Sequence, residues 1–113
     1  MRTIILLFGL CLLLGSTARA ESEAESTYKA RCVNCHGANG DGKGHAQMKI
    51  KPADFRAEAV QKMSDEELYN AIALGVEHIE YPHAFAKRGL SRKQILELVA
   101  YIRTFATKSK KNM

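Results

Sequence analysis

The stretch Cys32-Val33-Asn34-Cys35-His36 decides the expected fold, because it places two cysteines three residues apart with a histidine directly after the second. On one turn of helix, residues i and i+3 project from the same face, so both thiols reach the same edge of a flat ring. The imidazole of His36 then points at the centre of that ring. This spacing is typical of a covalently attached c-type haem, in which Cys32 and Cys35 form thioethers and His36 binds the iron as the proximal ligand.

Two other kinds of site share this cysteine spacing. A structural zinc site requires a second pair of ligands farther along the chain, and no cysteine follows Cys35. A redox dithiol of the thioredoxin type is expected just after a strand, whereas residues 27–31 have a helical pattern. The motif therefore favours one haem c per chain.

The first 20 residues have the pattern of a cleaved secretory signal peptide. A basic start at Arg2 precedes an apolar run from Ile4 to Gly15 and the small-x-small exit Ala18-Arg19-Ala20. The apolar run is shorter than the roughly 20 residues that a spanning helix needs. The alternative is that the segment is not cleaved and serves as a membrane anchor. We therefore expect cleavage after Ala20 and a periplasmic protein without stable membrane insertion.

The mature chain expected after cleavage has a mild positive charge. Of 113 residues 93 remain, and loss of Arg2 and Arg19 leaves 15 of the 17 basic residues against 12 acidic ones, a net charge of +3. This charge suits an acidic partner surface but is too small to predict nucleic-acid binding. Cys11 leaves with the signal peptide, so no cysteine remains for a disulfide if Cys32 and Cys35 both bind haem. A domain this small buries only a modest core, and a haem would add to it.

Helical patterns recur along the mature chain, and strand patterns do not. One helix is expected through Cys35, with Ser26 or Thr27 as its cap and Gly37 at its end. Capping-box sequences at Ser64 and Ser91 predict two more helices, the first of them ending at Gly75. The last helix repeats apolar residues in steps of three and four: Ile95, Leu98, Val99, Ile102 and Phe105.

The segments between these helices have no regular pattern. Residues 37–44 contain four glycines and are interpreted as a loop that passes near a haem edge, because a phosphate loop would end in Lys-Ser or Lys-Thr. Phe55 follows an extended piece and is expected in the core. The sequence predicts one all-α domain over residues 21–106, followed by a basic tail over residues 107–113.

With Cys32-Val33-Asn34-Cys35-His36-Gly37 near the start, Pro52-Ala53-Asp54-Phe55 in the middle and Leu98-Val99-Ala100-Tyr101-Ile102-Arg103 near the end, the chain resembles the small monohaem cytochromes c of bacteria. The resemblance implies a small cytochrome c fold, with three to four helices around one covalent haem and terminal helices that cross near Tyr101. It also implies a monomer that carries one electron through an exposed haem edge. Periplasmic redox proteins would be its donor and acceptor, and no catalytic residue is needed.

The chain departs from this family at the second axial ligand of the iron. The family usually has methionine followed by proline before the last helix, whereas Tyr81 precedes Pro82 here. His83 is the favoured replacement, since imidazole binds iron well and the loop differs in length from the family's. The other candidates are Met48, Tyr81, His78 and Met63. An open position would instead indicate a haem-based ligand sensor or a weak peroxidase, which is the alternative function.

Several cations flank the expected haem edge. They are candidates for steering the protein toward an acidic docking face, and ordinary solvated side chains are an equally good interpretation. These residues are Lys43, Lys49, Lys51, Lys87 and Arg88.

Overall fold

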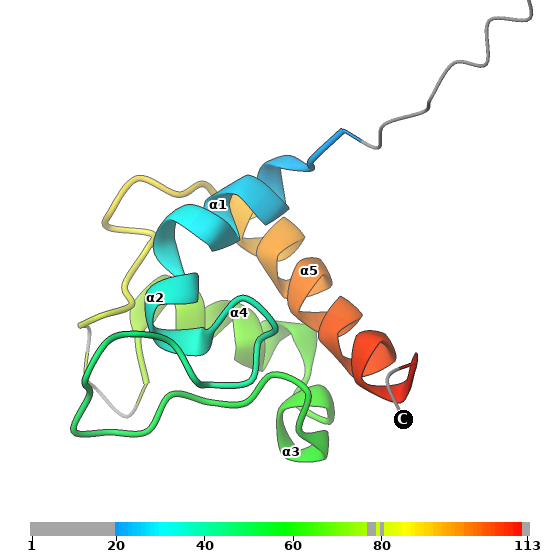
Figure 1. Ribbon diagram of the computed structural model, residues 1–113. Coiled ribbons are helices and arrows are strands. Elements are labelled where there is room, and N and C mark those ends of the chain that lie inside the picture. Colours follow the sequence, from blue (N-terminus) through cyan, green and yellow to red (C-terminus); the bar gives the residue numbers. More distant parts are fainter. Residues whose placement is uncertain (1–19, 77–78, 80, 112–113) are drawn as a thin grey trace, which may run out of the picture.

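The computed structural model describes residues 20–76, 79 and 81–111. In this part of the chain there are five helical segments and no strand, apart from an isolated bridge between Val76 and Ile79. The segments are α1 (Glu23–Arg31), α2 (Val33–His36), α3 (Glu58–Gln61), α4 (Asp65–Leu74) and α5 (Arg92–Lys111), as Figure 1 shows. The expected all-α class is confirmed. Among the described residues, no helix combines the length and the apolar character needed to cross a membrane.

Helix α1 begins four or five residues earlier than expected. Its N-cap is Ser22, whose hydroxyl accepts a hydrogen bond from the amide of Glu25 at 3.1 Å, so the predicted cap at Ser26 or Thr27 is wrong. Glu23 and Glu25 then lie in the first turn, where negative charge is stabilised by the helix dipole. The predicted continuous helix is also interrupted, because Cys32 has φ −117° and separates α1 from the single turn of α2.

The two predicted capping boxes are present. In the first, the amide of Glu67 donates to the Ser64 hydroxyl at 3.1 Å, and the Ser64 amide donates to the Glu67 carboxylate at 2.7 Å. At the start of α5, the amide of Gln94 donates to the Ser91 hydroxyl at 3.2 Å, and the Ser91 amide donates to the Gln94 side-chain carbonyl at 2.9 Å. Each box satisfies amide groups that a helix start leaves without partners.

Helix α5 continues to Lys111, so residues 107–111 of the predicted basic tail extend the helix. Lys108 folds its ammonium group back over two aromatic rings, at 5.3 Å from the centroid of Tyr101 and 5.2 Å from that of Phe105. A cation at this distance from an aromatic face is attracted by the ring quadrupole. The first part of the predicted tail is therefore helical, and its Lys108 side chain packs on the aromatic rings of the preceding turns.

The core lies along one face of α5, where the predicted apolar repeat is buried. Ile95 is 0% exposed, Phe105 1%, Leu98 and Val99 2% and Ile102 4%. Helix α1 crosses this face in Figure 1, and α4 also packs against α5. Tyr28 of α1 lies 5.2 Å, between ring centroids, from both Tyr101 and Phe105. This contact confirms the expected crossing near Tyr101.

The glycine-rich loop folds back along α2 and then reaches the core. The amide of Gly42 donates to the carbonyl of His36 at 2.9 Å, and the amide of Phe55 donates to that of Gly40 at 2.7 Å. Gly40 has φ +66°, and a Cβ at this position would lie 2.8 Å from the ring of Phe105. Glycine is required here by both the backbone conformation and the close approach of the ring.

Candidate haem site

A half-enclosed cavity lies where α2, the end of α4, residues 82–85 and the inner face of α5 meet. It offers ≈ 500 Å³ of space, the solvent at its mouth included. Four potential ligands or attachment points line it: Cys32, Cys35, His36 and His83. The wall around them is mainly apolar, from Phe55, Ile72, Phe85, Leu98 and Ile102. An apolar pocket with a few placed polar groups is the usual form of a cofactor site.

The two cysteines lie on one helical turn at the wall of the cavity. The amides of Cys35 and His36 both donate to the carbonyl of Cys32, at 3.2 and 2.9 Å. Residues three apart on such a turn face the same way, as the sequence predicted. Both thiols are free, and burial raises the pKa of Cys32 to about 11, so this group is protonated at neutral pH.

His36 is held in the tautomer that a metal ligand needs. Its Nδ1 lies 3.1 Å from the carbonyl oxygen of Ala53. A carbonyl can only accept, so Nδ1 carries the hydrogen and the lone pair is left on Nε2. The ring also stacks on Phe55, with centroids 4.2 Å apart and planes 17° apart. Burial lowers the pKa of His36, which favours the neutral imidazole.

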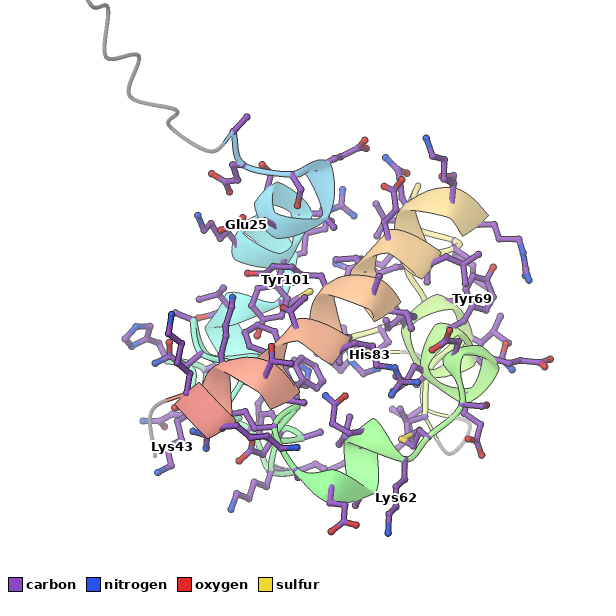
Figure 2. All side chains as sticks on the ribbon, turned by 90° about the vertical axis from the view of Figure 1, so that its right-hand side faces the viewer. Glu25, Lys43, Lys62, Tyr69, His83 and Tyr101 are labelled. Carbon is purple, nitrogen blue, oxygen red and sulfur yellow. The ribbon has the colours of Figure 1, made fainter. Side chains whose placement is uncertain are left out.

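His83 lies across the cavity from His36. The two ring centroids are 6.2 Å apart, and the ring planes differ by 13°. Burial, and the charges of His36 and Arg88, lower its pKa. In Figure 2, His83 lies in the middle of the view, whereas Glu25, Lys43 and Lys62 lie toward its outer edge.

The other proposed second ligands lie elsewhere or outside the described residues. Tyr81 is 77% exposed and is not part of the cavity wall. Met48, in the loop after α2, and Met63, just before α4, are both half-buried away from this wall. His78 lies outside the described residues.

The flanking cations are all exposed, as the two sequence interpretations require: Lys43, Lys49, Lys51, Lys87 and Arg88. Arg88 is also tied to the segment that carries His83. Its guanidinium lies 4.7 Å from the centroid of the Phe85 ring and donates to the carbonyl of Pro82 at 2.5 Å. Arg31 lines the cavity and was missed, although its place directly before Cys32 was a signal for it.

The described residues fit a covalent haem better than a bare metal ion. No group of three or more histidine, cysteine or acidic side chains that could hold an ion by itself occurs among them. A haem iron needs only one or two protein ligands, since the porphyrin supplies four nitrogens. Two thiols on one turn, an oriented imidazole and an apolar wall meet the remaining needs of a c-type haem.

Comparison with known proteins adds an independent finding. The family model for cytochrome c matches residues 22–106. No curated protein and no solved structure matched the chain in the corresponding comparisons. Because the family match spans most of the chain, and covers both the cavity and the helices that form it, the protein belongs to the cytochrome c family.

Proposed function

We propose that this cytochrome c transfers single electrons in the periplasm, through one haem held by Cys32, Cys35 and His36. A covalently bound c-type haem and a general role as an electron carrier follow from membership of the family. The observation that carries the finer proposal is the shared cavity, into which one helical turn brings both thiols and an imidazole whose Nδ1 is bonded to Ala53.

The attachment chemistry needs no oxidant or reductant. Each cysteine Sγ would bond to one carbon of a vinyl group and its thiol hydrogen would go to the other carbon, so that an S–H bond and one C=C π bond are replaced by C–S and C–H bonds. His36 would hold the iron through Nε2. When bound, the haem supplies a one-electron couple of the iron, whose potential depends on the axial ligands and on the surrounding polarity.

The residues around the cavity have a positioning role. Phe55 fixes the plane of the His36 ring by stacking, and the carbonyl of Ala53 fixes its tautomer. Such partners keep a ligating imidazole oriented and raise its basicity. The apolar wall limits the access of water, which influences the potential. These tasks require neither a catalytic base nor a nucleophile.

The periplasmic location rests on residues 1–20, which carry the features of a cleaved signal. Cleavage after Ala20 leaves α1 and its cap at Ser22 whole. Edman sequencing of the purified protein should therefore begin at Glu21. A protein that keeps Met1 and stays in the cytoplasm would contradict this location.

Spectroelectrochemical titration of the purified holoprotein tests the proposed function. We expect haem absorbance that changes with a one-electron Nernst slope in one reversible step. The double variant Cys32→Ala, Cys35→Ala should lack covalent haem and this couple. A wild-type protein that shows only a two-electron thiol couple, without haem absorbance, would overturn the proposal.

A further inference from the structure

We propose that His83 is the second axial ligand of the haem iron, so that the centre is six-coordinate with two histidines. This inference rests on the proposed haem attachment. It extends the family assignment, because membership leaves the second ligand of this chain unspecified, and the usual methionine position holds Tyr81.

The separation of the two imidazoles matches a shared metal ion. A metal–nitrogen bond to histidine is about 2 Å long, so two imidazoles that bind one ion from opposite sides have centroids roughly 6 Å apart. The centroids of His36 and His83 are 6.2 Å apart. The spacing between the histidines is therefore that of two ligands on one ion.

His36 makes the kind of hydrogen bond that a ligating imidazole makes. Its Nδ1 lies 3.1 Å from the carbonyl oxygen of Ala53. A neutral imidazole has one donor and one acceptor nitrogen, so a ring that donates to a carbonyl has its lone pair on the other nitrogen. Metal-ligating histidines almost always donate their second ring nitrogen in this way.

The end of α4 fixes the position of His83. The last carbonyls of a helix lack donors within the helix. The segment after His83 supplies donors for two of them. The amide of Phe85 donates to the carbonyl of Ile72 at 3.0 Å, and that of Ala86 donates to the carbonyl of Ala73 at 3.2 Å. The segment is thus attached to two successive residues of α4.

Backbone strain at the next residue supports a functional role for this segment. Ala84 has φ +58°, a left-handed conformation that is unusual for a residue with a side chain. It is only 6% exposed, so the surrounding packing holds it in this conformation. Strained residues of this kind cluster where a structure must hold a functional group in place. Here the strained residue directly follows His83.

Three consequences distinguish this centre from the alternatives. With both axial positions filled by protein, external ligands have no free coordination site, which favours an electron carrier over a sensor. A second histidine in place of a thioether also lowers the reduction potential. Because the ring planes differ by only 13°, the two imidazoles act on the same iron d orbital and should produce a rhombic low-spin ferric signal.

The experiment compares the purified holoprotein with three variants by electron paramagnetic resonance and near-infrared magnetic circular dichroism of the ferric state. Covalent haem is first verified by mass in every sample. His83→Ala removes the proposed ligand, and His83→Met replaces it with a thioether. His45→Ala is the matched control, since His45 is an exposed histidine in the glycine-rich loop.

We expect a rhombic, low-spin, bis-imidazole signature in the wild type and in His45→Ala. It should be lost in His83→Ala, return when free imidazole is added, and give way to a methionine signature and a higher potential in His83→Met. Ferrous His83→Ala should bind carbon monoxide, and the wild type should resist it.

A methionine or high-spin signature in the wild type would overturn the assignment of His83. So would a bis-imidazole signature that survives His83→Ala. In both cases the verified covalent haem leaves the proposed function standing. A wild-type protein without covalent haem would overturn both proposals.

Discussion

Replacement of Arg103 by methionine should weaken the fold more than an exposed ion pair would. Arg103 projects from α5 and bonds three residues between the end of α3 and the start of α4. Its Nη1 donates to the Gln61 carbonyl at 3.0 Å, and Nη2 donates to the Met63 carbonyl at 2.6 Å and to the Asp65 carboxylate at 2.8 Å. The arginine side chain is 29% exposed and that of Asp65 is 72% exposed.

The expected loss follows from these contacts. The ion pair with the exposed Asp65 contributes at most about 1 kcal/mol. Each hydrogen bond from the charged guanidinium to a carbonyl contributes about 1.5 kcal/mol, because the charged donor strengthens it. The free energy of unfolding should therefore fall by roughly 3–4 kcal/mol. Methionine keeps a similar aliphatic stem, so the loss reports the guanidinium bonds rather than packing.

Urea unfolding of the holoprotein, followed by far-UV circular dichroism, measures this loss. The midpoint should fall by roughly 1–4 M urea with an unchanged m-value. Arg56→Met is the matched control, because Arg56 binds Asp54 through two nitrogens at 3.0 and 2.9 Å but crosses only two residues of sequence. It should cost less than about 1 kcal/mol. Equal losses in the two variants would refute the bridging role of Arg103.

Three further changes test other parts of the fold. Gly40→Ala should cost roughly 2–4 kcal/mol in urea unfolding, since it combines a left-handed backbone with a clash against Phe105; Gly89→Ala, at φ +96° with open space around it, should cost clearly less. Ser64→Ala should lower the free energy of unfolding by about 1 kcal/mol through loss of its capping bond to Glu67, and an unchanged midpoint would count against the capping box. Burial raises the pKa of Tyr28 above its ordinary value of 10.0, so its contribution to stability is complete below that pH and is lost as pH rises above it. The stability gap between wild type and Tyr28→Phe should therefore narrow in urea series above pH 10, and a gap independent of pH would contradict this.

Local signals in the sequence predicted much of the fold. The capping boxes at Ser64 and Ser91 place their partners three residues away, so the sequence alone defines both helix starts. The apolar repeat of the last helix likewise predicts one buried face, because a period of 3.6 residues brings those side chains together. The start of α1 was misplaced because Ser22, Ser26 and Thr27 are all acceptable caps, and the packing of the helix decides among them.

Features that depend on distant contacts could not be predicted in this way. The carbonyls that Arg103 binds lie about 40 residues earlier in the chain, and no sequence pattern indicates them. The sequence favoured His83 by its chemistry and its place in the loop. Its position depends on backbone bonds to the last turn of α4, which is formed by a separate segment. The break at Cys32 likewise lies inside a pattern that looks continuously helical.

Peptide mapping of the purified protein tests the central claim most directly. Trypsin cleaves after Arg31 and Lys43, and the peptide over residues 32–43 contains both Cys32 and Cys35. The account predicts that this peptide gains the mass of one haem and has no thiol that an alkylating reagent can modify. The same peptide with two alkylated thiols and no haem would contradict it.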